Sequence, residues 1–244
     1  MMRIILCEGK TDAILLSYYL GRTKEWQHNP NPKKFKAKFS SNDNRAVYHY
    51  IKDDKELVIC AVGGKDNFIN FYKEYIEHYI IDSECTDLDY KIAIVVDRDD
   101  RSTKEIEEHL SENLSPSIST MADKKWCANA VHNRFGQEIA IFSLCVVIPK
   151  DQQGALENLL LDALSEEKYK ENIINKSKHF VESIVPEAKE IISTERLVLK
   201  TKLGVSLAVL YPEKVFSLID EQLKSIHWEK SKIINECFKY LVEI

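Results

Sequence analysis

The strongest constraint on the fold is a repeated alternation of short apolar runs with longer amphipathic stretches. Each run is nearly continuous in Val, Ile, Leu and Cys, which is typical of strands buried on both faces of a parallel sheet. The stretches that follow space their apolar residues at helical intervals. The pairs are residues 4–7 with 12–20, 57–62 with 67–81, 92–96 with 103–114, and 138–149 with 156–164. This order predicts an α/β fold in which helices flank a mainly parallel sheet.

A polar segment separates the first amphipathic stretch from the second apolar run. Residues 21–41 are rich in lysine and lie outside the regular alternation. They are followed by the sequence AVYHYIKDDKELVICAV, in which Lys52-Asp53-Asp54-Lys55 forms the predicted turn of a β-hairpin.

The pattern changes after Ser165. Charged and apolar residues then alternate at helical spacing, and Pro186 and Pro212 are the expected first residues of helices, a position that proline favours. We expect an α/β core over residues 1–165. An all-helical C-terminal region over residues 166–244 is expected to pack on that core.

The composition is that of a globular protein with reduced thiols. The 244 residues are 44% hydrophobic and 30% charged. No apolar run approaches the ~20 residues that cross a membrane, and the first run is too short for a signal peptide, so we expect a cytoplasmic protein with no membrane partner. The six cysteines form no Cys-x-x-Cys pair and are expected to be buried thiols. They are Cys7, Cys60, Cys85, Cys127, Cys145 and Cys237.

The net charge of -5 argues against a surface that binds nucleic acid indiscriminately, although a local basic patch can hold phosphates. One basic segment interleaves lysines with two phenylalanines. Its members are Lys33, Lys34, Phe35, Lys36, Lys38 and Phe39. Such a segment either binds a nucleic-acid backbone or is a solvated lysine-rich loop, and the sequence leaves both interpretations open.

The sequence Gly9-Lys10-Thr11 looks like the end of a phosphate-binding P-loop. A P-loop of the form G-x-x-x-x-G-K-[ST] needs another glycine five residues before the second one, because the intervening backbone wraps the phosphates. Ile4 stands at that position, inside the first apolar run. No loop is left to wrap a phosphate, and we exclude the P-loop.

Acidic residues follow the first and third apolar runs. Glu8 ends the first run, Gly9 permits a sharp exit, and Asp12 lies in the first turn of the following helix. Asp97 and Asp99 follow the third run and project alike if the strand geometry persists. Because ligand sites of open α/β sheets gather at the carboxyl ends of strands, we expect these carboxylates to converge. An all-oxygen set without His or Cys favours Mg or Mn.

These positions together resemble the Toprim domain of topoisomerases, primases, recombination proteins and OLD-type nucleases. The resemblance rests on the Glu-Gly-x-x-Asp turn that begins at Glu8 and on Asp97-x-Asp99 after the third run. Gly63 and Gly64 occupy the matching place after the second run. The resemblance covers roughly two thirds of the chain and implies a Rossmann-like Toprim core. In that family the residue matching Glu8 is a metal ligand or general acid/base, and those matching Asp97 and Asp99 bind Mg.

The later sequence resembles a small bacterial Toprim family akin to the OLD nucleases. The segment VVIPKDQQGALENLLLDAL looks like its fourth-strand exit and helix start. The segments LKTKLGVSLAVLYPEKVF and HWEKSKIINECFKYLVEI look like its lysine-bearing segment and closing helix. By this resemblance Glu157 contributes to a second metal site, and Lys200 or Lys202 reaches a phosphate.

The resemblance implies a nuclease that hydrolyses phosphodiester bonds of DNA or RNA with one or two Mg or Mn ions. In metal-dependent nucleases one cation activates water and a second stabilises the leaving oxygen. The acidic ligands must therefore surround a gap that the phosphate can enter.

Two other functions remain open. OLD nucleases join their Toprim domain to an ATPase, and this chain has no P-loop, so a module that binds metal, nucleic acid or a separate ATPase partner without turnover is the main alternative. Asp97-Arg98-Asp99 also fits the nucleophile motif of haloacid dehalogenase phosphatases. That motif normally follows the first strand, whereas two strand-helix units precede it here, so this alternative ranks lower.

Simpler roles are also open for individual acids. Asp12 can serve only to cap its helix, and a glutamate such as Glu157 is ordinary near a helix start. Asp100 stands beside Asp99, so the sequence does not decide which members of this acidic group would bind metal.

Overall fold

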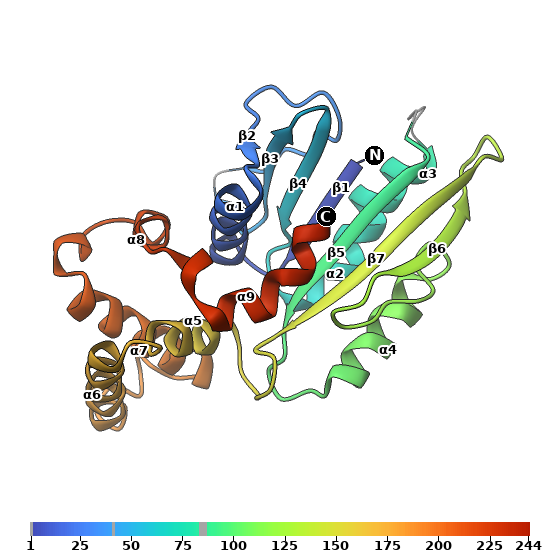
Figure 1. Ribbon diagram of the computed structural model, residues 1–244. Helices are drawn as coiled ribbons and strands as arrows, with labels where there is room; N and C mark the ends of the chain where they lie inside the picture. Colours follow the sequence, from blue (N-terminus) through green and yellow to red (C-terminus); the bar gives the residue numbers. More distant parts are fainter. Residues whose placement is uncertain (1, 41, 83–86) are drawn as a thin grey trace.

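A seven-stranded mixed β-sheet forms the centre of the protein, seen in a computed structural model (Figure 1). The structure describes residues 2–40, 42–82 and 87–244. The strands are β1 (Met2–Cys7), β2 (Gln27–His28), β3 (Ala46–Lys52), β4 (Lys55–Ala61), β5 (Asp89–Asp97), β6 (Cys127–His132) and β7 (Glu138–Ile148). Their order is β2-β3-β4-β1-β5-β7-β6, with β4, β1, β5 and β7 parallel. The expected α/β fold is confirmed.

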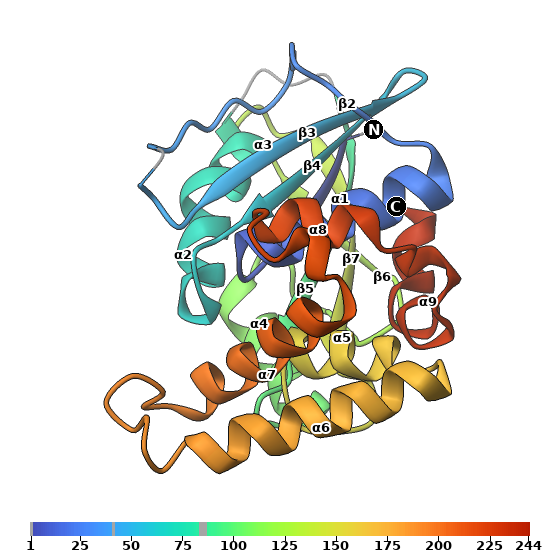
Figure 2. The same ribbon diagram turned by 90° about the vertical axis from the view of Figure 1, so that its left-hand side faces the viewer.

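Helices flank the sheet and form most of the C-terminal region. They are α1 (Lys10–Lys24), α2 (Phe68–Phe71), α3 (His78–Asp82), α4 (Thr103–Leu114), α5 (Leu156–Leu164), α6 (Lys168–Ile184), α7 (Glu195–Leu210), α8 (Ile219–Ser225) and α9 (Lys232–Phe238). A π-helical segment, Tyr72–Glu77, joins α2 to α3, where the sequence predicted a single helix. In both Figure 1 and Figure 2, α6 and α7 lie at one end of the sheet, beside α5.

The position of the central strand β1 between two cores explains why its sequence is apolar throughout. Ile5 and Cys7 belong to a core shared with α1, α5, α7 and α9. Ile4 and Leu6 belong to a second core, formed with α2, α4 and the π-helical segment on the other face. Successive side chains of a strand point to opposite faces, and here both faces are covered.

The edges of the sheet are antiparallel. The predicted hairpin is confirmed, because β3 and β4 pair with Lys52 opposite Lys55. Asp53 in its turn has a φ of +53°, a conformation that aspartate tolerates better than most residues. At the other edge β6 pairs with β7 and was missed, since its residues alternate between exposed and half-buried positions without an apolar run.

The C-terminal region is helical, as predicted, but its helices do not all begin where prolines predicted them. Pro186 lies in the turn that follows the end of α6. Proline is also common just after a helix, because it cannot continue one. The next helix, α7, begins at Glu195, and the hydroxyl of Thr194 caps it by accepting a hydrogen bond from the N–H of Leu197. Pro212 does begin a helical segment, the single 3-10 turn Pro212–Lys214.

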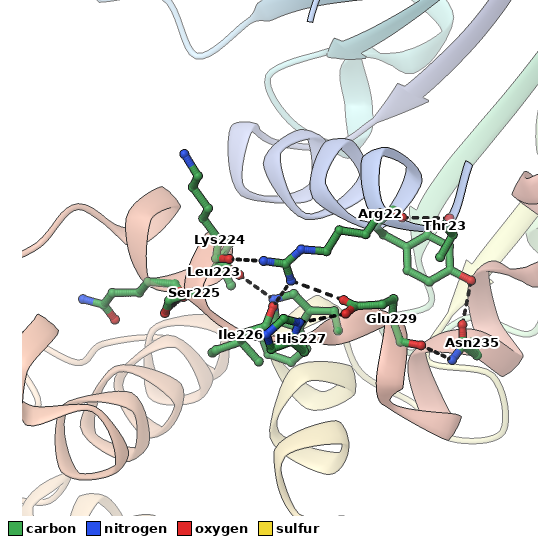
Figure 3. Close-up of polar contacts among 12 residues, drawn as sticks. Arg22, Thr23, Leu223, Lys224, Ser225, Ile226, His227, Glu229 and Asn235 are labelled. Carbon is green, nitrogen blue, oxygen red and sulfur yellow. Dashed lines mark hydrogen bonds and ion pairs between the residues drawn. The ribbon is translucent and has the colours of Figure 1, made fainter. Parts of the chain in front are cut away.

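Polar contacts join the last part of the chain to α1 (Figure 3). Arg22 donates from Nη2 to the carbonyl oxygen of Lys224 at 2.6 Å and forms an ion pair with Glu229 at 3.2 Å. Tyr19 donates its hydroxyl hydrogen to Oδ1 of Asn235 at 2.9 Å. These contacts, together with the apolar core that the two regions share, fix the C-terminal helices against the sheet layer.

The described cysteines are free thiols. Cys127 on the edge strand β6 is only half-buried, which differs from the prediction. The other described cysteines are buried as predicted: Cys7, Cys60, Cys145 and Cys237. Cys85 lies outside the described residues. Across the described ranges, none of the helices has the length and apolar character needed to span a membrane.

Candidate functional site

A cleft of about 620 Å³ lies just beyond the carboxyl ends of β1 and β5. The N-terminal halves of α1, α5 and α7 also line it, together with the loop that follows β4. Its charged lining residues are Glu8, Lys10, Asp12, Lys65, Asp99, Glu157, Arg196 and Lys200. The cleft therefore combines groups of both signs from segments that lie far apart in the sequence.

Glu8 is held by both its backbone and its side chain. Its carbonyl oxygen accepts hydrogen bonds from the N–H groups of Gly63 at 3.0 Å and Gly64 at 2.9 Å. Both glycines have positive φ angles, +86° and +131°, which residues with a side chain rarely adopt. The carboxylate oxygen Oε1 accepts a hydrogen bond from the N–H of Asp97 at 3.0 Å. Glu8 thus ties together the ends of three neighbouring strands.

Asp12 both caps α1 and faces the cleft. Its Oδ2 accepts a hydrogen bond from the N–H of Gly9 at 3.1 Å, which satisfies a donor at the start of the helix. The residue is buried and lines the cleft. Asp12 therefore does cap its helix, the simpler role that the sequence left open, and its carboxylate still lines the cleft.

Asp97 is the last residue of β5 and is only 1% exposed. Its Oδ1 accepts a hydrogen bond at 2.8 Å from the N–H of Leu156, the first residue of α5, where the helix dipole favours an anion. Its Oδ2 is also buried but makes no aligned hydrogen bond. One oxygen of this carboxylate is thus fixed by a backbone hydrogen bond, and the other has none.

The expectation that Asp99 projects like Asp97 is wrong. Asp99 has a φ of +50°, and its backbone exchanges two hydrogen bonds with Gly154, so strand geometry ends at Asp97. Asp99 nevertheless lines the cleft, where its Oδ2 accepts a hydrogen bond from Nζ of Lys65 at 2.7 Å. Asp100 is exposed and does not line the cleft.

Arg196 is a site residue that the sequence analysis missed. Its Nη1 lies 2.7 Å from Oδ2 of Asp97 and 3.8 Å from Oδ1 of Asp99. Its Nε lies 3.4 Å from Oε2 of Glu157, which is a buried residue of the first turn of α5. The contacts to Asp97 and Glu157 are ion pairs without hydrogen-bond alignment, because both carboxylate oxygens lack a hydrogen-bond partner.

A sequence signal for Arg196 does exist. Thr194 is a good N-cap, which places Arg196 in the first turn of a helix. Lys200 follows four residues later, so both cations lie on the same face of α7. Both line the cleft. Lys202 does not line it, since its Nζ lies 2.6 Å from Oε1 of Glu182 on α6. Of the two lysines that the sequence left open, the structure places only Lys200 in the cleft.

Burial and mutual repulsion raise the pKa values of the cleft carboxyl groups. Burial, reinforced by the nearby charge of Asp97, raises the pKa of Glu8 to about 8 and that of Asp12 to about 7. Burial also raises the pKa of Asp97 to about 6, although Arg196 opposes the shift. Burial lowers the pKa of Arg196, but the charges of Asp97 and Glu157 outweigh it and raise that pKa above its usual value. The carboxyl groups therefore repel one another, and Arg196 relieves part of that repulsion.

The basic segment of residues 33–39 lies apart from this cleft. Phe35 is buried and packs edge-on against Tyr79, with ring centroids 5.6 Å apart. Phe39 packs in the same way against Tyr75 at 5.4 Å. The lysines that point to solvent are Lys33, Lys36 and Lys38. Lys34 forms an ion pair with Asp87. Both aromatic rings therefore contribute to the packing of this segment.

The donors of the cleft fit a hard divalent cation. Glu8, Asp12, Asp97 and Glu157 supply only carboxylate oxygens, the ligands that Mg and Mn prefer. The buried oxygens Asp97 Oδ2 and Glu157 Oε2 lack hydrogen bonds, and a cation would satisfy both. Within the described ranges, no group of three or more His, Cys, Asp or Glu side chains stands ready to hold a metal ion. The residue types and the unpaired oxygens fit the ion, but its entry requires side chains to move.

The fold and the cleft define an α/β protein with buried carboxylates at the carboxyl edge of its sheet. The chain belongs to the family described as "Protein of unknown function (DUF3226)", which matches residues 2–236. No curated protein matches the chain. A hypothetical protein from Pyrococcus horikoshii OT3, known from a crystal structure, is similar over 99% of this chain and 100% of its own, with 12% sequence identity and a TM-score of 0.46.

Proposed function

We propose that the protein is a metal-dependent phosphodiester hydrolase that acts on nucleic acid. The observation that carries the proposal is a cluster of carboxylates. Glu8, Asp12 and Glu157 line a cleft that also holds basic side chains, and Arg196 of the same cleft contacts the buried Asp97. Buried acids that repel one another are costly to keep together, and they are common where a protein binds a cation or performs chemistry.

The residues of the cleft divide into two sets with different roles. Glu8, Asp97 and Glu157 would hold Mg or Mn, and Asp12 and Asp99 stand close enough to complete the site after side-chain movement. When bound, the cation lowers the pKa of water and stabilises negative charge on phosphate oxygens. Glu8 keeps its carboxylate at the end of β1 through the glycine turn and the N–H of Asp97.

Basic residues of the same cleft bind the phosphate. Lys200 is exposed on α7 and lines the cleft, and Lys65, which follows β4, lines it as well. Lys65 is paired with Asp99 at 2.7 Å, so it is held near the acids without being buried. Charge-assisted contacts of this kind position an anionic backbone against the carboxylates.

The size of the site favours a polymer over a small phosphate ester. A second cavity of about 400 Å³ adjoins the cleft, and the two share Asn44 and Gly63 in their linings. Asparagines line this second cavity together with Asp43, Arg45 and Glu74, and amides can donate to and accept from the edges of bases. The lining residues of that type are Asn42, Asn44, Asn67 and Asn70. The two cavities together leave room for nucleotides on one side of the cleaved bond.

The test is a cleavage assay on labelled single- and double-stranded DNA and RNA with Mg or Mn. We expect cleavage by the wild type, loss of cleavage on chelation, and loss in Glu8→Gln and Asp97→Asn. Lys202→Ala is the matched control, because Lys202 lies on the same helix as Lys200 but outside the cleft lining. Full activity in Glu8→Gln and Asp97→Asn would contradict the proposed site. Absence of cleavage of every substrate by the wild type would contradict an enzyme that acts alone and would favour the binding module.

A further inference from the structure

Arg196 occupies the position between carboxylates where a cation is expected. Its guanidinium contacts Asp97 at 2.7 Å and Glu157 at 3.4 Å, and the carboxylate oxygens it approaches are the two that lack hydrogen bonds. An arginine in a permanent structural ion pair normally forms parallel, aligned hydrogen bonds with the carboxylate. The contact here compensates charge without the geometry that fixes an arginine in place.

The position of Arg196 in the fold allows it to leave. Its side chain is 36% exposed, whereas that of Asp97 is fully buried, so the guanidinium enters the site from the solvent side. Its backbone is fixed near the start of α7, and that helix is anchored by the buried residues Leu203 and Leu207. A rotation of the side chain alone would therefore withdraw the charge while α7 stays where it is.

The carboxylates need a positive partner whether or not a metal is bound. Asp97 and Glu157 are 1% and 7% exposed, and a buried anion without a compensating charge is strongly destabilising. Arg196 supplies that charge in the described structure. A divalent cation bound by the same oxygens would supply more of it and would repel the guanidinium.

We propose that Arg196 is a built-in competitor of the metal, which neutralises Asp97 and Glu157 in the metal-free protein and is displaced when a divalent cation binds. The inference rests on the proposed function in so far as that function requires the cation. On displacement, Arg196 stays on the cleft-facing side of α7 with Lys200 and is placed to bind the phosphate of the substrate. Metal binding thereby breaks the ion pairs of Arg196 with Asp97 and Glu157 and leaves its guanidinium free to contact the substrate.

The experiment is a calorimetric titration of Mn²⁺ into the wild type, Arg196→Gln and Lys200→Gln. Both substitutions remove one positive charge from the cleft lining, but only Arg196 contacts the unpaired carboxylate oxygens. We expect Arg196→Gln to bind Mn²⁺ at least about fivefold more tightly than the wild type, the lower end of typical coupling between two ligands of one protein. Lys200→Gln is expected to change the affinity by less than about twofold, because its charge is solvated.

A second readout covers the case in which Arg196→Gln folds poorly. In the presence of chelator, the melting temperature of Arg196→Gln is expected to lie below that of the wild type. Saturating Mn²⁺ is expected to reduce this difference between the two melting temperatures. Arg196→Lys keeps the charge and is expected to bind Mn²⁺ with an affinity between those of the wild type and Arg196→Gln.

The outcomes separate this inference from the proposed function. If the wild type binds Mn²⁺ and Arg196→Gln binds it equally or more weakly, the competition is refuted while the metal site stands. If Arg196→Gln and Lys200→Gln bind more tightly by the same factor, the effect is general electrostatics and the inference is likewise refuted. If neither the wild type nor Arg196→Gln binds Mn²⁺, the metal site fails and the inference fails with it.

Discussion

Two regions of this protein concentrate charge, and they use it in opposite ways. The basic segment of residues 33–39 gathers its lysines within a few positions of the sequence, yet most of them are exposed to solvent. The acids of the cleft are spread from Glu8 to Glu157 in the sequence, yet they share one cavity and repel one another. The density of charge along the sequence is therefore a poor guide to the density of charge in space.

The aromatic residues explain how the basic segment holds its shape. Phe35 and Phe39 pack on the tyrosines of the helical segment beneath them, and Arg45 lies over the ring of Phe39 at 4.5 Å. The lysines between them need no partner, because they remain hydrated. At the cleft the order is reversed, since Asp12, Asp97 and Glu157 are buried and depend on the charge of Arg196. We expect the basic segment to be sensitive at its aromatic residues and the cleft at its charged ones.

The largest expected effect lies in the basic segment. Phe35→Ala should lower the free energy of unfolding by about 3 kcal/mol, because it removes a buried ring that packs against Tyr79. Lys36→Ala, the adjacent control, should change it by less than about 0.5 kcal/mol. Chemical denaturation measures both. Equal losses in the two variants would show that the charges, and not the aromatic rings, hold this segment.

Manganese should stabilise the cleft by a comparable amount. At about 100 times its dissociation constant, a ligand that binds only the folded state adds about 2.7 kcal/mol to the free energy of unfolding. We expect this gain in the wild type and its loss in Glu157→Gln, which removes one buried carboxylate of the proposed site. Thermal unfolding with and without Mn²⁺ measures it. A gain that survives in Glu157→Gln would place the bound ion elsewhere.

The metal-free protein should lose stability as the pH rises from about 5 to 8. Glu8, Asp12 and Asp97 have pKa values raised to about 8, 7 and 6, so in this window the folded state holds protons that the unfolded state has released. The stabilisation is complete at low pH and is lost as the pH rises through the folded pKa values. Each kcal/mol lost lowers the melting temperature by about 2–4 °C in a chain of this size.

The control for the pH effect is Glu8→Gln, which removes the group with the most strongly raised of the three pKa values. Its melting temperature in chelator should depend less on pH than that of the wild type over the same range. A melting temperature that rises steadily from pH 5 to 8 in the wild type would contradict the raised pKa values.

The smallest effect is expected from the exposed lysines. Replacement of Lys33, Lys36 and Lys38 together by alanine should leave the free energy of unfolding within about 0.5 kcal/mol of the wild type, since these side chains are exposed. If the cleft is the site of nucleic-acid binding, the triple variant should also keep its affinity for an oligonucleotide within about twofold at moderate salt. A loss of affinity of tenfold or more, measured by fluorescence anisotropy, would show that the basic segment binds the oligonucleotide.

The sequence predicted the parts of the fold that depend on local patterns. The buried strands and α4 and α5 were recognisable because apolar runs and helical spacing are properties of neighbouring residues. The edge strand β6 was not, because its residues are half-buried and its pairing with β7 depends on a partner found only in space. The break after α6 was misplaced for a related reason, since proline marks helix ends as readily as helix starts.

The candidate site was predictable where it lies at the ends of strands. Glu8 and Asp97 could be placed because parallel strands bring their carboxyl ends to one edge. The sequence could place Arg196 in the first turn of a helix but not beside Asp97, since that contact depends on how α7 packs in the fold. The geometry of Asp99 was also hidden, because its positive φ results from the pairing with Gly154, fifty-five residues away in the sequence.

Anomalous diffraction from crystals grown or soaked with Mn²⁺ would locate the ion directly. We predict an anomalous peak among the carboxylates of Glu8, Asp97 and Glu157, with the guanidinium of Arg196 displaced from Asp97. A peak at another position, or none at a concentration that saturates binding in solution, would contradict the claim that these carboxylates form a metal site.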